Sequence, residues 1–328
     1  MSFSQLTKVD ARPVPSGGGE IRLFLAVKNE VARLPYFFEY YRSLGVDRFF
    51  AVDNLSTDGT GEFLDAQQDC HHFVTAGQYF TENVSPPSWT NALANVFGDG
   101  HWSITVDADE LLVYPHCETL GLRELCGFLE MTGAEGLFAP MIDMYGAGPI
   151  AASTYKSGAS FIDANPWHDP SPGWIKHVDG QCPPIQMFGG VRERVFWKGR
   201  FRSALPPCIS KVPLIRWRKG MQYIVSMHFH SGAVLSELRG ALLHFKFLAG
   251  FQAATAESLQ YAQGIVEKGL GERVAYNEAL IKNPDLALWN SESVKYSGTD
   301  QLVKQGWLKT SQIFESHVQM LKLDRRHP

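Results

Sequence analysis

The sequence predicts an α/β protein with a mostly parallel central sheet flanked by helices, followed by a C-terminal helical extension. Three observations lead to this prediction. Short apolar β-type segments alternate with amphipathic helical segments in the first 110 residues. The connections between them are short, which implies parallel strands and right-handed crossovers. Acidic residues follow directly on the ends of several predicted strands.

The first elements form a strand, helix, strand and helix in that order. Residues 21–27 are a short apolar run and predict a strand. Residues 33–44 predict a helix, closed by Gly45 as a C-cap, because apolar side chains recur there at helical spacing. Residues 48–52 predict the next strand, which ends on Asp53-Asn54. A turn at 57–60 then begins a helix over 62–68.

Two further strands end on acidic residues. Residues 102–106 lead directly into Asp107-Ala108-Asp109-Glu110, and residues 136–142 end on Asp143. In open α/β sheets the ligand crevice lies beyond the carboxyl ends of the strands. We therefore expect Asp53, Asp107 and Asp143 to lie along one edge of the sheet.

The second half of the chain is less regular. Residues 145–221 are rich in Gly, Pro, Trp and Arg and predict long functional loops with short strands. Residues 223–230 predict a strand, and the chain from 236 onward, including 238–261, is expected to be helical. This divides the protein into a flexible N-terminus at 1–19, an α/β domain at 20–235 and a helical region at 236–328.

Composition excludes several classes of protein. The 328 residues are 45% hydrophobic and 20% charged, which is typical of a globular chain. A net charge of -4 gives no case for general nucleic-acid binding. We find no signal sequence and no run of about 18 apolar residues. The five cysteines contain no Cys-x-x-Cys pair, which argues against a disulfide framework or a thiolate zinc site and favours a cytoplasmic location.

Basic residues are concentrated between 192 and 219. A solvated surface and an anion-binding surface are equally compatible with this distribution. The segment contains one acid, Glu193, and nine basic residues: Arg192, Arg194, Lys198, Arg200, Arg202, Lys211, Arg216, Arg218 and Lys219.

The pair Asp107 and Asp109 is the leading candidate for chemistry. Two carboxylates at this spacing after a strand can reach one divalent cation, and Mg²⁺ or Mn²⁺ prefers oxygen ligands that it shares with substrate phosphates and water. An isolated Asp-x-Asp is equally typical of loops and turns. The motifs around it therefore decide its interpretation.

Four segments resemble, in order, markers of the glycosyltransferase family 2-like proteins. The resemblance spans roughly residues 21–250, and it rests on Val27-Lys28-Asn29-Glu30, Leu44-Gly45-Val46-Asp47, Asp53-Asn54-Leu55-Ser56-Thr57-Asp58-Gly59-Thr60 and Val106-Asp107-Ala108-Asp109-Glu110-Leu111-Leu112. It implies a GT-A fold, which is Rossmann-like, a nucleotide-diphosphate sugar as donor and inversion at the anomeric carbon. Residues 20–235 would then form the nucleotide-sugar-binding and catalytic domain.

The resemblance also implies roles for individual residues. Asp107 and Asp109 would hold Mn²⁺ or Mg²⁺, which offsets the charge on a departing nucleotide diphosphate. Asp107 would also contact the nucleotide sugar. The base and ribose would lie against Lys28, Asn29, Glu30 and Asp53. Without the resemblance, a capped turn is the competing and less favoured interpretation of residues 53–60.

The segment 188–196 resembles a marker of one branch of the same family. Its two glycines allow the backbone to approach a ligand closely, and the guanidinium groups of Arg192 and Arg194 suit diphosphate oxygens. An inverting transfer needs a carboxylate that takes the acceptor's proton. Our candidates are Glu193 first and Asp143 second, although the Glu-Asp pair common in the family is absent. Glu193 equally suits an ion pair with its neighbouring arginines.

Histidines late in the chain form another group. His228 and His230 would share one face of the strand predicted over 223–230. By resemblance to GT-A enzymes, His244 would be a third metal ligand with Lys246 near the phosphates, and His228 is the alternative ligand. A buried structural histidine is the competing interpretation for each. The tryptophans are expected to pack mainly in the core, with sugar stacking as the alternative: Trp89, Trp167, Trp174, Trp197 and Trp217.

The leading functional hypothesis is a metal-dependent glycosyltransferase acting on a glycan, lipid or protein acceptor. One alternative is an inactive sugar-nucleotide-binding protein of the same fold. The other is a phosphohydrolase of the haloacid dehalogenase type, which is disfavoured because two β-α units precede the Asp-x-Asp. If the acceptor is a lipid, the basic segment 192–219 would touch the inner face of an anionic membrane.

Overall fold

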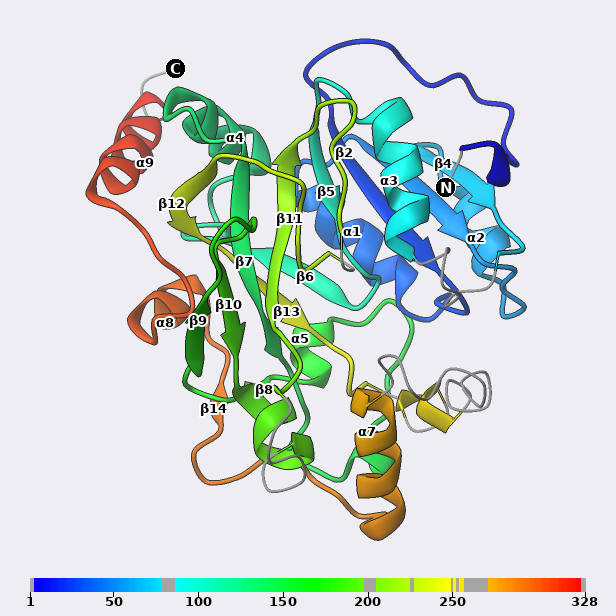
Figure 1. The fold of residues 1–328 in the computed structure, drawn as a ribbon, viewed down its shortest axis with the longest axis vertical. Helices are drawn as coiled ribbons and strands as arrows, with labels where there is room; N and C mark the ends of the chain where they lie inside the picture. The colour runs from blue at the N-terminus through cyan, green and yellow to red at the C-terminus, as the bar shows by residue number, and fades with distance from the viewer. Residues whose placement is uncertain are drawn as a thin grey trace.

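The computed structural model describes residues 3–77, 86–197, 205–224, 227–248, 250–251, 254–256 and 271–325. A ten-stranded sheet runs through the molecule in the order β1-β4-β3-β2-β5-β11-β7-β13-β6, with β12 beside β7 (Figure 1). Its strands are β1 (Thr7–Lys8), β2 (Ile21–Val27), β3 (Arg48–Asp53), β4 (Cys70–Val74), β5 (Trp102–Thr105), β6 (Glu110–Val113), β7 (Gly136–Asp143), β11 (Ser210–Arg216), β12 (Leu235–Arg239) and β13 (Ala241–His244).

Helices and short hairpins surround this sheet. The helices are α1 (Leu34–Leu44), α2 (Thr60–Ala66), α3 (Pro86–Phe97), α4 (Leu122–Met131), α5 (Phe161–Ala164), α7 (Gly271–Lys282), α8 (Thr299–Lys304) and α9 (Gln312–Asp324). Short 3-10 turns lie at η1 (Phe3–Gln5) and η2 (Ile150–Ala152), and η3 (Arg192–Trp197) is a π-helical turn. Two strand pairs stand apart from the main sheet: β9 (Trp174–His177) with β10 (Ile185–Phe188), and β8 (Trp167–His168) with β14 (Val294–Lys295).

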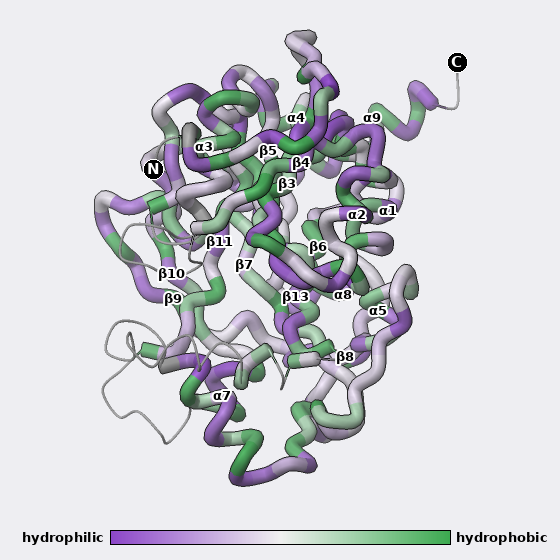
Figure 2. Tube along the Cα trace, turned by 90° about the vertical axis from the view of Figure 1, so that its right-hand side faces the viewer, coloured by the Kyte–Doolittle hydropathy of each residue, from purple (hydrophilic) through white to green (hydrophobic). Residues whose placement is uncertain are grey.

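The N-terminal elements form as their sequence predicts. α1 carries Pro35 in its first turn and ends at Gly45, whose φ of 102° is the left-handed conformation that glycine adopts without strain. The apolar stripe of α1 packs Phe38 against Phe49 of β3, with ring centroids 4.2 Å apart. Each such buried aromatic side chain contributes about 1.5–3 kcal/mol. In Figure 2 the tube beside the β3 label is coloured hydrophobic, in agreement with the five buried residues of β3.

Strand direction brings the acidic strand ends to one edge. β2, β3, β4 and β5 pair in parallel, and β11 pairs antiparallel with both β5 and β7. β7 therefore runs in the same direction as β5, and β13 is parallel to β7. Asp53, Asp143 and the segment that follows β5 consequently share the carboxyl edge, as expected. In Figure 1 this edge faces the part of the molecule that holds α5 and α7.

The expectations for the C-terminal third need correction. Residues 235–239 and 241–244 are strands of the main sheet, so the helical prediction from 236 is wrong there and the expected domain boundary falls within β12. Helices α7, α8 and α9 do follow. Tyr223 and His230 form only an isolated bridge to each other, so the strand predicted over 223–230 is absent from its described residues.

Candidate active site

The register of three strands assembles the centre of the site. In the sheet, His244 at the end of β13 pairs with Glu110 of β6 on one side and with Asp143 of β7 on the other. Tyr41 of α1 holds β6 in place, because its hydroxyl donates to the carbonyl of Glu110 at 3.0 Å and accepts from Leu112 N at 3.0 Å. The sheet therefore fixes these side chains on neighbouring backbones at the carboxyl edge.

Asp143 is held by two basic residues. Arg192 donates from Nε and Nη2 to the two carboxylate oxygens of Asp143 at 2.8 and 2.9 Å. His244 Nδ1 lies 2.6 Å from Asp143 Oδ1. Burial opposes ionisation of Asp143, but the charge of Arg192 and the bond from His244 outweigh it and hold its pKa well below the usual range. Asp143 is thus a fixed carboxylate that orients His244.

The other ring nitrogen of His244 faces Asp109. The distance from His244 Nε2 to Asp109 Oδ2 is 3.5 Å. Burial alone lowers the pKa of His244, but the charge of Asp109 and the bonds to Asp109 and Asp143 outweigh it and raise that pKa above its ordinary value. Burial likewise opposes ionisation of Asp109, yet His244 holds its pKa far below the usual range. The fold thus brings together Asp109 and His244, two of the three residues predicted as metal ligands.

Lys211 of β11 neutralises the other two acids of the cluster. Its ammonium is ion-paired with Glu110 and lies 3.1 Å from Asp107 Oδ2. Lys211 and Glu110 are buried, whereas the Asp107 side chain is 41% exposed. Burial raises the pKa of Glu110 despite the opposing charge of Lys211. Asp107 is therefore the acid of this group that solvent and a ligand can reach.

Glu30 adds a further carboxylate beside the cluster. It accepts from Arg33 Nη1 at 2.7 Å. Desolvation of this half-buried group raises its pKa to about 7, and although Arg33 opposes the shift, the negative charges of Asp109 and Asp107 add to it. The negative charges of Asp107 and Asp109 thus act on Glu30, which is an electrostatic setting that a bound cation relieves.

The segment after β2 is bound to the turn after β3. Asn29 N donates to Ser56 Oγ at 2.8 Å, and Thr57 N donates to Asn29 Oδ1 at 2.9 Å. Asp53 Oδ1 accepts from the backbone and hydroxyl of Ser56, so the capped-turn interpretation of Asp53 holds in this structure. Lys28 and Asn29 lie on the same loop, and the Asn29 side chain is exposed. The two loops form one rigid rim beside Glu30.

Helix α7 borders the opposite side of the cluster. Its Glu272 lies 3.4 Å from Arg192 Nη1 and 3.6 Å from Lys246 Nζ. Lys246 also lies over the ring of Tyr276, 5.2 Å from the centroid. Burial opposes ionisation of Glu272, but Lys246 and Arg192 lower its pKa to about 2. Lys246 is therefore held at the rim of the site through contacts with α7.

Two of the predicted residues in η3 point to other partners. Glu193 accepts from Trp174 Nε1 of β9 at 3.0 Å. Arg194 donates to both carboxylate oxygens of Asp169 and to the carbonyl of Leu288. The expected ion pair of Glu193 with its neighbouring arginines is not found among the described contacts, and of this segment it is Arg192 that joins the cluster.

His228 occupies a turn next to the cluster rather than a strand. Its Nδ1 lies 2.7 Å from the carbonyl of Ser210, the residue before Lys211. Burial lowers its pKa to about 4, and the positive charge of Lys211 adds to that shift. The imidazole is thus neutral near pH 7, and the carbonyl contact fixes Nδ1 as the protonated nitrogen. His228 keeps an unprotonated Nε2, as a metal ligand requires.

Residues that the sequence did not single out complete the site. Arg33, Lys211 and Glu272 each form ion pairs with the cluster. The sequence does contain a pattern that indicates a strand position for Lys211, because this lysine begins an apolar strand-like run, Val-Pro-Leu-Ile. The described residues of the basic segment 192–219 fall into two groups. Arg192 and Lys211 are buried, whereas Arg216 and Arg218 are exposed and pair with Glu130 and Glu135. Lys198, Arg200 and Arg202 lie outside the described residues.

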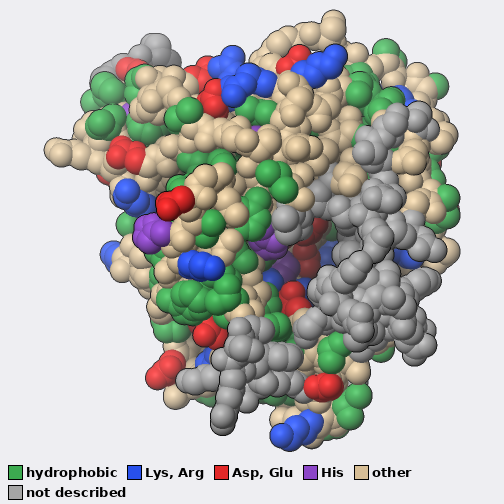
Figure 3. Space-filling model, viewed as in Figure 1, with side chains coloured by type: hydrophobic (Ala, Val, Ile, Leu, Met, Phe, Trp, Pro, Cys, Tyr) green, Lys and Arg blue, Asp and Glu red, His purple; other side chains and the backbone are tan. Residues whose placement is uncertain are grey.

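Among the described residues, no three His, Cys, Asp or Glu side chains are grouped so that they could hold a metal ion, so the three predicted ligands Asp107, Asp109 and His244 do not converge. Asp109 and His244 nevertheless supply an oxygen and a nitrogen ligand 3.5 Å apart, close to the roughly 3 Å expected between adjacent ligands at 2.1 Å from one cation. Mg²⁺ is commonly held by one or two carboxylates with substrate phosphates, so the donor set fits a cation shared with a ligand. Figure 3 shows acidic and histidine side chains gathered in a hollow of the face seen.

The tryptophans differ in their exposure. Trp89 and Trp217 are fully buried in the core, while Trp174 is 39% exposed and stacks on Phe188. The five cysteines are free thiols. None of the described helices is both long and apolar enough to cross a membrane.

Comparisons with known proteins give little further guidance. No family model matches the sequence. No curated protein matches it either. Among solved structures, the chain is similar to the UTP-bound UGPase from Acinetobacter baumannii, at 10% sequence identity and a TM-score of 0.30, over 81% of this chain and 84% of that chain. A similarity of this size carries no functional argument, so function has to be argued from the site.

Proposed function

We propose that this protein is a metal-dependent glycosyltransferase that moves a sugar, with inversion, from a nucleotide-diphosphate sugar to a glycan, lipid or protein acceptor. The supporting observation is the pairing of Asp109 with His244 at 3.5 Å, at the carboxyl edge of the sheet. The rim formed by the loops after β2 and β3 stands beside this pair. That edge is where open α/β sheets bind nucleotides.

In this proposal Asp109 and His244 would hold Mn²⁺ or Mg²⁺, with the exposed Asp107 as a further carboxylate ligand. A bound cation there supplies electrophilic help by offsetting charge on the leaving diphosphate. His228, neutral and adjacent to Lys211, is the alternative nitrogen ligand. Asp143 keeps the imidazole of His244 in a fixed orientation, as carboxylates commonly do for metal-bound histidines.

The nucleotide and its phosphates would be recognised by groups on opposite sides of this centre. Lys28, Asn29 and Glu30 line the rim that receives the base and ribose, and Asp53 shapes that rim by capping its turn. Lys246 would bind phosphate oxygens, and this is supported by the position of its ammonium group at the edge of the site, 3.6 Å from Glu272. Arg192 adds a buried positive charge inside the cluster. Arg194 anchors η3 to Asp169.

Of the two carboxylates considered as the base, Asp143 is engaged by Arg192 and His244, so a role in positioning suits it better. Glu193 accepts a hydrogen bond from the Trp174 indole and forms no ion pair among the described residues. Glu193 therefore remains our proposed base for the acceptor hydroxyl.

The test is release of nucleoside diphosphate from a panel of nucleotide sugars, with Mn²⁺, with Mg²⁺ and after EDTA treatment. We expect metal-dependent release, and loss of at least about 100-fold in Asp109→Asn, because oriented electrostatic stabilisation is commonly worth that much. The matched control is Asp179→Asn, which changes an exposed acid in the β9–β10 hairpin.

Thermal melting of both variants shows whether they stay folded. Wild-type turnover in Asp109→Asn, or release unaffected by EDTA, would contradict the proposed metal site. Binding of nucleotide sugars without any release would identify an inactive binding protein. Release of phosphate from phosphomonoesters would identify the phosphohydrolase alternative.

A further inference from the structure

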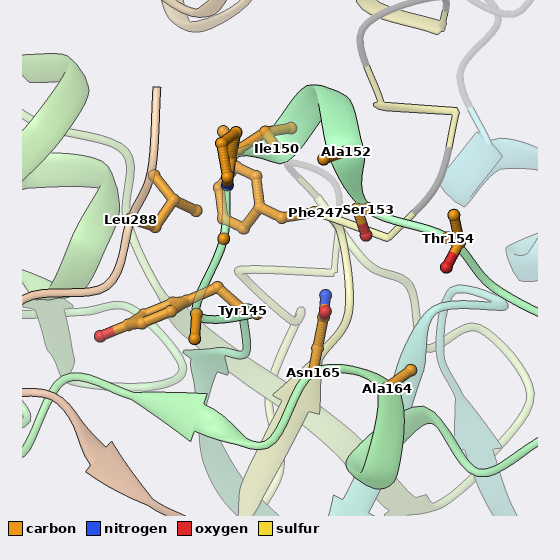
Figure 4. Close-up of a pocket in the computed structure, with 13 residues that line it drawn as sticks. Tyr145, Ile150, Ala152, Ser153, Thr154, Ala164, Asn165, Phe247 and Leu288 are labelled. Carbon is orange, nitrogen blue, oxygen red and sulfur yellow. The ribbon is translucent and has the colours of Figure 1, made fainter. Parts of the chain in front are cut away.

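A separate pocket begins directly beyond the charged cluster. It has a volume of about 240 Å³, and its walls include Tyr145, Pro149, Asn165 and Phe247 (Figure 4). Tyr145 follows Asp143 by two residues and Phe247 follows His244 by three, so these two wall residues lie at most about 7–11 Å of chain from the strand ends. The pocket therefore adjoins the carboxyl edge that carries the cluster.

The chemistry of the walls excludes a charged ligand group. None of the residues that line the pocket carries a charged side chain. The ring of Tyr145 faces it, but the hydroxyl contacts Asp169 Oδ1 at 2.6 Å and Ser293 Oγ at 3.0 Å. Phe247 and Leu288 add apolar surface, and the hydroxyls of Ser153 and Thr154 add neutral polar groups. A phosphate group would find no cation in this pocket. A neutral polar ring would find apolar surface and neutral hydrogen-bonding groups.

Asn165 supplies a directional polar contact. Its side chain points into the middle of the pocket in Figure 4 and is 1% exposed. The amide nitrogen has no hydrogen-bond partner among the described residues. On the other side of the amide, Oδ1 is so close to Gly146 that a Cβ there would lie 3.2 Å from it. A buried donor without a partner is unfavourable unless a ligand or a water molecule accepts from it.

We propose that this pocket binds one uncharged sugar ring of a substrate, with a hydroxyl or amide oxygen accepting from Asn165 Nδ2. The volume supports a group of that size, because pockets for drug-sized molecules measure roughly 300–1,000 Å³. Apolar walls with a few placed polar groups are typical of such sites. The assignment rests on the proposed transferase function for its setting. The ring can come from the donor or from the acceptor, and the experiment separates these sources.

Two variants perturb the pocket without touching the charged cluster. Asn165→Ala removes the donor, and Ala164→Leu places bulk on the pocket wall at the end of α5. Asn283→Ala is the matched control, because it removes an exposed amide just after α7. Melting temperatures establish that all three variants are folded.

Calorimetry with Mn²⁺ measures binding of UDP-glucose, UDP-N-acetylglucosamine and GDP-mannose, each against bare UDP or GDP. Saturation-transfer NMR measures binding of methyl glucoside, galactoside, mannoside and N-acetylglucosaminide. We expect Asn165→Ala to weaken the sugar-dependent affinity roughly 3- to 10-fold, as loss of one hydrogen bond predicts. Ala164→Leu should weaken it further, while Asn283→Ala and the bare nucleotides stay unchanged.

A loss confined to the nucleotide sugars assigns the ring to the donor, and a loss confined to the methyl glycosides assigns it to the acceptor. The pocket assignment is overturned if both variants bind every ligand as the wild type does, or if the wild type binds none of them. Metal-dependent turnover together with unchanged pocket variants would retain the proposed function and remove this inference. Glycoside binding that depends on Asn165, without any turnover, would retain the pocket assignment and remove the proposed transferase function.

Discussion

Lys211→Met tests whether the buried charge network holds the carboxyl edge together. The lysine and Glu110 are 3% and 0% exposed in their side chains, so the substitution leaves a buried carboxylate without its counter-ion. Removing one partner of such a pair costs about 3–5 kcal/mol, which is a large share of the roughly 5–15 kcal/mol by which proteins of this kind are stable. The pair with Asp107 adds little to this figure, because Asp107 is 41% exposed and screened.

The assay is urea-induced unfolding at pH 7.5, followed by circular dichroism. Lys211→Met/Glu110→Gln is the informative partner variant, because the glutamine oxygen can still accept from Asp107 N, as Glu110 does at 3.1 Å. We expect the double variant to recover about 2 kcal/mol or more of the loss, since no uncompensated charge remains. A loss below about 1 kcal/mol in Lys211→Met, or a double variant no more stable than the single one, would refute the reasoning.

Three further predictions concern stability. His230 is buried between the rings of Trp217 and Tyr223, and burial lowers its pKa to about 4. Its contribution to stability is therefore complete above about pH 6.5 and is lost as the pH falls towards 4. His230→Phe should flatten the pH dependence of unfolding in that range by up to about 1.4 kcal/mol per pH unit, and an unchanged slope would disprove this. Gly127→Ala should raise the free energy of unfolding by about 0.5–1 kcal/mol, because the glycine is exposed inside α4 and an added Cβ meets nothing within 4 Å. Gly173→Ala should instead lower the melting temperature by several degrees, since φ is +76° and a Cβ would lie 2.0 Å from the Phe188 carbonyl oxygen. A melting temperature equal to wild type in that variant would contradict the close packing of β9 and β10.

The elements that could be predicted from the sequence are those with local signals. β2 and α1 follow from an apolar run and a helical stripe, and Gly45 closes the helix by its own conformational preference. β13 has no such signal. Its four residues, Ala-Leu-Leu-His, are apolar without a period, and a short buried strand cannot be told from a helix by periodicity. Its conformation is decided by pairing with β6 and β7, which lie more than 90 residues earlier.

The same limit applies to the site. Asp107 and Asp109 were predicted as metal ligands because they directly follow a strand. His244 was predicted as a ligand because of its resemblance to a motif of GT-A enzymes. Lys211 was placed only in the basic segment 192–219, with a solvated and an anion-binding surface both open, since sequence spacing does not show that β11 enters the sheet between β5 and β7. Its place at the carboxyl edge results from the reversed direction of β11, which brings the first residues of that strand beside Asp107. The charge balance of the site could therefore not be derived from the motifs alone.

That charge balance constrains how a ligand enters. Among the described residues the cluster contains six acids and five bases, namely Glu30, Asp107, Asp109, Glu110, Asp143 and Glu272 against Arg33, Arg192, Lys211, His244 and Lys246. Burial raises the pKa of Glu30 to about 7, and the charges of Asp109 and Asp107 add to this shift, so further negative charge is disfavoured beside Glu30. A nucleotide diphosphate is itself an anion and would be repelled from this point unless positive charge arrives with it. If the proposed function holds, a divalent cation that reaches Asp109 together with the diphosphate would offset both charges, and we therefore expect the two to enter as one complex.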